Sequence, residues 1–198
     1  MRTSWRRIGL VAFYLAALPA GAASAWWTLQ RVDAFGSASG PWRVSLLAGS
    51  ADADLHTRAR VALGGLLALN RDETMYFVAR VDSAGAPLRS RCRYRVSGAP
   101  PAARWWSITA YADDLFLFPD PLRRYGVNGA SAAHDGAGRF TFVSGPEAPQ
   151  PGVGVPWVPT PGDRGLVYTL RLYQPASSLR AAPAAVAAPR IERLGDCP

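Results

Sequence analysis

Aromatic and cationic side chains crowd the middle of this chain in a pattern that suits ligand binding. Trp106 and Tyr111 share one apolar stretch, and two arginines, a tyrosine and an asparagine follow within residues 123–128. Rings beside arginine and amide groups suit sugars, carboxylates or other small anions. The candidate ligand-binding residues are Glu73, Tyr94, Trp106, Tyr111, Arg123, Arg124, Tyr125 and Asn128, with Tyr76 beside them. The alternative is that the rings form the core and that Glu73 joins a buried ion pair.

No catalytic motif accompanies these residues. Asp113 and Asp114 are adjacent carboxylates, but neighbouring side chains in a turn diverge, and turns favour aspartate for its local backbone hydrogen bonds. His134 lies in a turn and His56 opens a helix, and no G-x-S-x-G motif is present. We therefore predict no catalytic residues and interpret the two aspartates as turn residues.

Cofactor and metal motifs are also missing from the sequence. Neither a G-x-x-x-x-G-K-[ST] phosphate loop nor a G-x-G-x-x-G fingerprint occurs. The two cysteines, Cys92 and Cys197, lack the spacing of a zinc site, and only two histidines could join them. We expect no cofactor and no metal.

The positive charge has an explanation other than nucleic acid. All 22 basic residues are arginine, and the net charge is +8. Three of them, Arg2, Arg6 and Arg7, precede an apolar segment, and the others are scattered among acidic residues in runs no longer than two. A nucleic-acid interface concentrates its arginines and lysines on one face, so no nucleic-acid partner is expected.

The apolar segment from Ile8 to Leu29 contains 22 residues without a formal charge. As a helix it would measure about 33 Å, enough to cross a bilayer core of about 30 Å. The arginines before it favour a cytoplasmic N-terminus, and Trp26 and Trp27 suit an interfacial belt. A cleaved signal peptide ending at the A-x-A pattern of residues 23–25 is the alternative. Both hypotheses export the rest of the chain.

Export changes the interpretation of the cysteines. In an oxidising compartment Cys92 and Cys197 can pair and tie the C-terminal tail to a strand. The alternative is two unpaired thiols.

The chain divides into three regions. Residues 1–30 form the membrane segment, and residues 31–53 read as a linker with one short extended segment. Residues 54–198 form the main domain, which opens with a helix from Asp54 to Asn70 that carries leucines at helical spacing.

The rest of the main domain is rich in strands. In residues 104–111 alternation places Trp106 on one face and Trp105 on the other, and we expect Trp106 to face the core. A turn at Asp113 and Asp114 leads into a returning strand, and the tail after Pro175 is expected to wrap the surface. The expected strands cover 73–82, 91–98, 104–111, 115–120, 139–143 and 166–175. Their spacing predicts an antiparallel β-sandwich or jelly-roll-like domain with one packed helix.

Six motifs in order give the chain a family resemblance. The motifs occupy residues 73–77, 85–88, 105–111, 122–125, 155–161 and 170–175. Together they resemble the domain of unknown function 1214, over Asp54 to Arg193, in a short form similar to membrane-anchored bacterial members that lack domain 1254. Arg123 stands where the family has asparagine, and Asp113 falls one residue late. The resemblance implies a mostly β domain and no established reaction.

The leading hypothesis is a non-enzymatic domain that binds a small ligand or an envelope partner. It places the domain in the bacterial periplasm, with residues 8–29 in the inner membrane and the N-terminus in the cytoplasm. The rival hypothesis is an enzyme that acts on a small envelope metabolite or glycan through Glu73, Tyr111 and residues 123–125.

Overall fold

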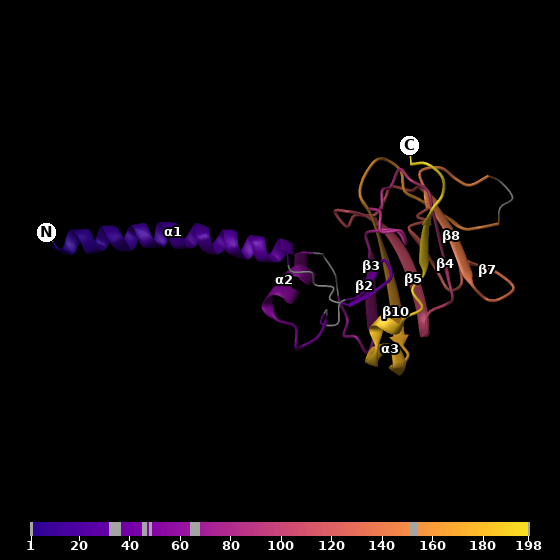
Figure 1. Ribbon diagram of the computed structural model, residues 1–198, viewed down its shortest axis with the longest axis horizontal. Coiled ribbons are helices and arrows are strands. Elements are labelled where there is room, and N and C mark those ends of the chain that lie inside the picture. Colours follow the sequence, from indigo (N-terminus) through magenta and orange to yellow (C-terminus); the bar gives the residue numbers. More distant parts are fainter. Residues whose placement is uncertain are drawn as a thin grey trace.

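A computed structural model describes residues 2–31, 37–44, 47, 49–63, 68–150 and 154–197. A long N-terminal helix, α1 (Arg2–Arg31), extends away from a domain built of β-sheets (Figure 1). Within α1, Arg6–Thr28 has a mean hydropathy of 1.7 and is not buried anywhere in the molecule. Its 23 residues measure about 35 Å. This helix is compatible with a membrane anchor or with a signal sequence.

Two antiparallel sheets form the domain. The first contains six strands in the order β1 (Ser37–Ser39), β2 (Trp42–Val44), β3 (Thr74–Ala79), β10 (Leu166–Pro175), β5 (Ala103–Ala112) and β6 (Gly126–Asn128). The second contains β11 (Arg190–Arg193), β4 (Tyr94–Gly98), β8 (Phe140–Gly145) and β7 (Ala133–His134), with β9 (Trp157–Pro159) parallel to β8. Among its described residues the domain has the helices α2 (Leu55–Leu63) and α3 (Ser177–Ala181) and the 3-10 helix η1 (Pro183–Ala185). The mainly antiparallel β fold that the sequence predicts is confirmed.

Strand alternation builds the core between the sheets. On β5, Trp106, Ile108 and Ala110 are buried, whereas Trp105 is 43% exposed, as the alternation predicts. The Trp106 ring packs on Phe140 of the other sheet with 4.4 Å between centroids. Apolar side chains from both inner faces therefore meet in one core, and burying them supplies most of the driving force for folding.

A polar pair lies inside this core. The Tyr168 hydroxyl forms a hydrogen bond with Ser144 Oγ, which joins the two sheets. The rings of Tyr94 and Phe142 pack edge-on against Tyr168. Burial raises the pKa of the Tyr168 phenol, so this group stays neutral and hydrogen-bonded.

The region predicted as a linker contributes two strands. Residues 37–44 form the β1–β2 hairpin, which turns at Gly40 with φ of 57°, and β2 pairs with β3. Trp42 is fully buried, and its Nε1 donates to the carbonyl of Pro189 at 2.7 Å. The hairpin is therefore an edge of the larger sheet.

The helix predicted for residues 54–70 is observed as α2, which covers Leu55–Leu63. Asp54 caps α2, because its Oδ1 accepts from the Thr57 amide at 2.9 Å. Residues 68–70 are not helical, and residues 64–67 lie outside the described part. The Asn70 side chain instead accepts from the amides of Asp72 and Glu73, which shapes the turn before β3.

Two further predictions need correction. The returning strand after Asp114 is reduced to one bridge between Tyr111 and Leu117, and Phe116 is 72% exposed. The tail does not merely wrap the surface, because β11 pairs with β4 and buries Ile191. The apolar run after Asp114 misled the prediction, because Phe116 and Leu117 lie in solvent. β11 is too short for alternation to reveal, since one or two inward residues set no period.

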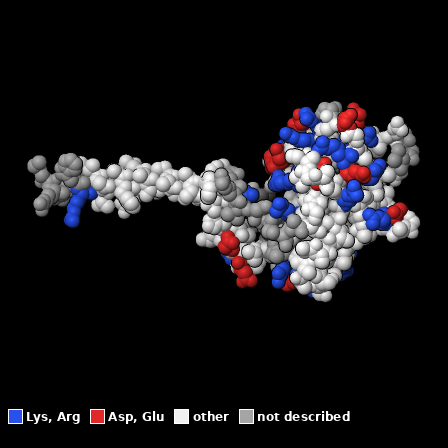
Figure 2. All heavy atoms as spheres, viewed as in Figure 1, with Lys and Arg blue, Asp and Glu red and all other residues white. Residues whose placement is uncertain are grey.

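Charged side chains cover the domain unevenly. Figure 2 shows arginine and acidic side chains interspersed over one end of the domain, while most of α1 carries no charge. The mixture of signs agrees with a solvated surface.

Candidate functional site

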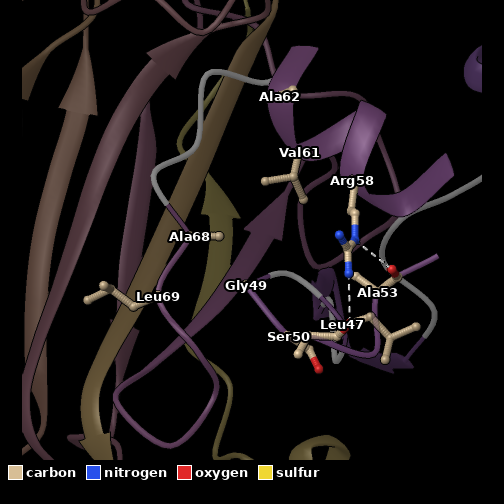
Figure 3. A pocket seen from close by; sticks show the side chains of 10 residues that line it. Leu47, Gly49, Ser50, Ala53, Arg58, Val61, Ala62, Ala68 and Leu69 are labelled. Carbon is tan, nitrogen blue, oxygen red and sulfur yellow. Dashed lines mark hydrogen bonds between the residues drawn. The ribbon is translucent and has the colours of Figure 1, made fainter. Parts of the chain in front are cut away.

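A cleft of about 840 Å³ lies beside α2 (Figure 3). Small apolar side chains line most of it, including Val61 and Ala62 of α2. Its cation, Arg58, donates from Nε to the Ala53 carbonyl at 2.8 Å and from Nη2 to the Ala51 carbonyl at 2.7 Å. The guanidinium is thus engaged in holding the loop, and the cleft offers little polar chemistry.

A groove of about 460 Å³ lies on the outer face of the six-stranded sheet. Its floor is a row across three neighbouring strands, because Tyr173 of β10 lies opposite both Thr74 of β3 and Trp105 of β5. Glu73, Gln174 and Arg104 are the next residues along these three chain segments, and Leu69 completes the lining. The groove therefore combines two aromatic rings with a carboxylate, a guanidinium and an amide.

The polar groups of the groove are held in place. Arg104 Nη1 donates to the side-chain Oε1 of Gln174 at 3.2 Å, and the backbone N–H of Gln174 donates to the backbone carbonyl of Glu73 at 2.7 Å. Gln174 has a φ of 47°, a left-handed conformation that costs a non-glycine residue about 1–3 kcal/mol. Such strain is concentrated at binding and catalytic sites.

Thr74 adds an unsatisfied group to this floor. The residue is 1% exposed, and its Oγ1 has no hydrogen-bond partner among the described residues. A buried hydroxyl without a partner costs about 1–3 kcal/mol, and this one lies beneath the surface of the groove.

Two predicted site residues belong to the core. Tyr94 is fully buried, and its hydroxyl accepts from the Arg89 amide at 3.0 Å. Trp106 is 4% exposed and packs on Phe140. Neither ring faces the groove.

Tyr111 lies on the outer face at the opposite end of the sheet from Glu73. Arg171 Nη2 donates to the Tyr111 hydroxyl at 2.9 Å, and Arg171 Nη1 donates to Thr109 Oγ1 at 3.2 Å. Tyr111 is six residues along β5 from Trp105, which is about 20 Å at 3.3 Å per residue. Glu73 and Tyr111 therefore cannot act on the same bond.

Arg124 belongs to a separate cluster. It forms a two-pronged ion pair with Asp120, at 2.9 Å and 3.1 Å, and its guanidinium lies 4.6 Å from the Trp157 ring centre. The hydrogen bonds from Arg124 lower the pKa of Asp120 to about 2. This cluster holds the loop between β5 and β6 against β9.

The remaining candidates also shape that loop. Arg123 is exposed and has a φ of 55°, and the Tyr125 carbonyl accepts from the Ala110 amide. The Asn128 side chain accepts from the amides of Ala130 and Ser131. Of the eight predicted site residues, Glu73 is the one that lines the groove.

The sequence interpretation missed Trp105, Tyr173, Arg104 and Gln174. One signal could have found the first, because the alternation that puts Trp106 in the core puts Trp105 on the outer face. The others needed the register, since only the pairing of β10 with β5 brings Tyr173 beside Trp105.

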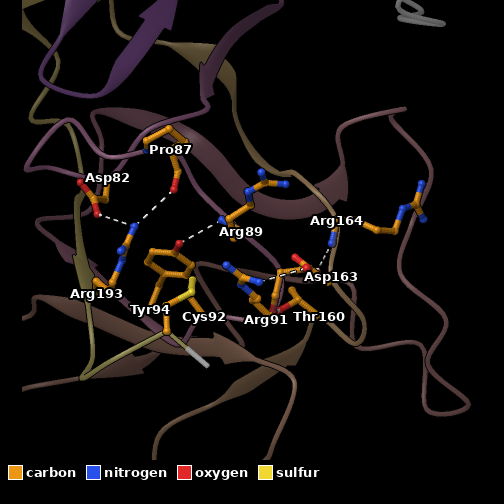
Figure 4. Close-up of a disulfide and its surroundings, with 12 residues drawn as sticks. Asp82, Pro87, Arg89, Arg91, Cys92, Tyr94, Thr160, Asp163, Arg164 and Arg193 are labelled. Carbon is orange, nitrogen blue, oxygen red and sulfur yellow. Dashed lines mark hydrogen bonds and ion pairs between the residues drawn. A yellow bond between two sulfur atoms is a disulfide. The ribbon is translucent and has the colours of Figure 1, made fainter.

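A disulfide joins Cys92 and Cys197, whose Cα atoms are 4.6 Å apart (Figure 4). Two ion pairs lie near it, Arg91–Asp163 at 3.1 Å and Arg193–Asp82 at 3.6 Å. No cluster of three potential metal ligands occurs among the residues that the structure describes. The disulfide fastens the C-terminal tail beside β4.

These features define a class of protein, a two-sheet antiparallel β domain that follows an apolar helix. A family model described as "Protein of unknown function (DUF1214)" matches residues 73–177, just over half of the chain, and the protein belongs to this family. The match begins at Glu73 and is narrower than the resemblance that the sequence motifs suggest.

One solved structure supports this fold, and a second aligns more weakly. The VPA0106 protein from Vibrio parahaemolyticus aligns with a TM-score of 0.58 and 20% identity over 73% of this chain and 36% of that one. A putative uncharacterized protein from Burkholderia cenocepacia aligns with a TM-score of 0.39 and 17% identity, over 62% and 29% of the two chains. The chain thus spans about a third of the length of these proteins. No curated protein matches the sequence.

Proposed function

We propose that the protein is an exported, membrane-anchored domain that binds a small saccharide in the groove on its outer sheet face and catalyses no reaction. The observation that carries this proposal is the exposure of Trp105. This residue is 43% exposed, and it lies in the same row across the sheet as Tyr173 and Thr74. A large ring kept partly in water, in a polar-lined hollow, suits a ligand with one flat apolar face.

The chemistry of the groove favours an uncharged, hydroxyl-rich ligand over an anion. Glu73 and Arg104 contribute opposite formal charges, so the lining has no net charge. Arg104 already donates to Gln174. Carboxylate and amide groups accept from and donate to hydroxyls. A sugar ring stacked on Trp105 would meet these groups at its edge.

The same lining argues against catalysis. Acid–base cleavage of a glycosidic bond uses two carboxyl groups, and Glu73 is the one carboxylate among the described residues that line the groove. Arg104 cannot give up its proton in a protein. The rival hypothesis of an enzyme that joins Glu73 to Tyr111 is disfavoured by the length of β5 between them.

We further propose that the domain lies in the bacterial periplasm, with α1 in the inner membrane and the N-terminus in the cytoplasm. Arg2, Arg6 and Arg7 before the apolar span support this orientation. The disulfide between Cys92 and Cys197 supports an oxidising compartment.

A thermal-shift screen of the detergent-solubilised full chain tests the binding proposal. Neutral mono- and oligosaccharides should include at least one that raises the Tm, because a ligand that binds the folded state stabilises it. The Trp105→Ala variant should lose this response, and Phe116→Ala, which removes a ring 72% exposed elsewhere, should keep it. A response that survives in Trp105→Ala, or a response to small carboxylates alone, contradicts the proposal.

A further inference from the structure

The α2 helix turns its leucines outward. Leu55 is 82% exposed and Leu63 is 65% exposed, whereas Thr57 is 6% exposed. At 100° per residue the two leucines lie about 80° apart around the helix axis, with Ala59 between them. A surface helix of a soluble protein normally turns such an apolar stripe to the core. Here the stripe faces away from the protein.

Polar contacts fix α2 in this orientation. The Asp54 carboxylate accepts from both the amide and the hydroxyl of Thr57, at 2.9 Å and 3.1 Å, on the buried side of the helix. Arg58 binds the carbonyls of Ala51 and Ala53 in the preceding loop. Polar contacts, and not burial of leucine, therefore hold the helix against the domain. The outward stripe has no partner among the described residues of the chain.

The stripe lies next to the end of the apolar span. α1 and α2 contact each other, and Figure 1 shows α2 beside the C-terminal end of α1, between that end and the sheets. Trp26 and Trp27 near this end are 63% and 57% exposed. Tryptophan is enriched where a membrane meets water. If Arg6–Thr28 spans a bilayer, α2 lies at the level of the lipid headgroups.

We infer that α2 rests on the membrane surface with Leu55 and Leu63 inserted among the lipids. This inference rests on the proposed anchoring of α1. Two arginines and two aspartates in residues 52–63 balance in charge, so apolar burial and not headgroup charge drives the contact. The lipid surface required is a zwitterionic or mixed bilayer, and the contact is insensitive to salt. It holds the domain in one orientation above the membrane.

Site-specific fluorescence quenching tests this contact in the full chain, reconstituted in phosphatidylcholine vesicles. Both native cysteines are in the disulfide, so a thiol introduced by Leu55→Cys or Leu63→Cys takes an NBD label selectively. Leu122→Cys serves as a matched control, because Leu122 is 71% exposed in the loop after β5. Phe13→Cys, within the span, reports the anchor itself.

The inference predicts that the probes at 55 and 63 are quenched by nitroxide lipids and are several-fold less quenched by aqueous iodide than the probe at 122, at low and high salt alike. Iodide quenching at 55 and 63 equal to that at 122, with the probe at 13 in lipid, overturns the inference and leaves the anchor intact. Protection from both quenchers also overturns it, because protein then covers the stripe. Loss of the probe at 13 by cleavage overturns both the anchor and the inference.

Discussion

At the scale of single residues, two neighbouring tryptophans have different roles, because Trp106 stabilises the core and Trp105 is proposed to bind the ligand. Trp106 is 4% exposed in the core, so Trp106→Ala should lower the free energy of unfolding by about 3–5 kcal/mol. Trp105 is 43% exposed, and Trp105→Ala should cost about 1 kcal/mol or less. Urea unfolding of both variants measures the difference. Equal losses would contradict the assignment of the two faces of β5.

Asp120 links stability to acid pH. Its side chain is 4% exposed, and Arg124 holds its pKa at about 2, below the ordinary value of 3.8. The folded state therefore prefers the ionised carboxylate. The stabilisation of the folded state by ionised Asp120 is fully present above about pH 4 and is lost as the pH falls towards 2.

Asp120→Asn should consequently lower the Tm at pH 6, and the gap to the wild type should narrow as the pH approaches 2. Thermal unfolding from pH 6 to pH 2 measures this gap. A gap that stays constant across the range would show that the ionised carboxylate does not stabilise the fold.

At the scale of elements, the disulfide fastens the C-terminal tail and β11 to the second sheet. It closes a loop with a sequence separation of 105, and such long loops gain the most from a crosslink. Cys197→Ser should therefore lower the free energy of unfolding by about 2–5 kcal/mol. Cys197 is the better site for substitution, because Cys92 is fully buried and a serine there would add a buried hydroxyl. Unfolding within about 0.5 kcal/mol of the wild type would contradict a stabilising role.

The long strands were predictable from sequence because each carries several alternations. β5 and β10 have ten residues each, and the alternating positions of apolar residues such as Ile108 and Leu170 indicate which face is buried. β1 and β7, with three and two residues, exist only because a neighbouring strand pairs with them. The strand propensity of two or three residues is too weak to predict such short strands.

The candidate site was less predictable than the fold. Glu73 could be proposed from its type and place, but the groove joins residues from β3, β5 and β10 that are about 30 to 100 positions apart in sequence. Register alone brings Thr74, Tyr173 and Trp105 into one row. The rings that the sequence suggested, Tyr94 and Trp106, serve the core instead.

At the scale of the whole molecule, the fate of α1 decides where the domain works. We expect the mature protein to keep its N-terminus and to stay in the membrane fraction after extraction at alkaline pH. The apolar run continues through Trp26 and Trp27, beyond the A-x-A pattern. Intact-mass spectrometry of the protein from a bacterial membrane measures this. A mature chain that begins at Trp26 would show a signal peptide and a free domain.

The central claim is that a saccharide binds over Trp105. The most direct measurement is ¹⁹F NMR of the full chain with 5-fluorotryptophan at its seven tryptophans, titrated with a saccharide that raises the Tm. The resonance that Trp105→Phe removes identifies Trp105. The account predicts that this resonance shifts on titration while that of the buried Trp106 does not. A Trp105 resonance that stays in place at a saccharide concentration that saturates the rise in Tm would contradict it.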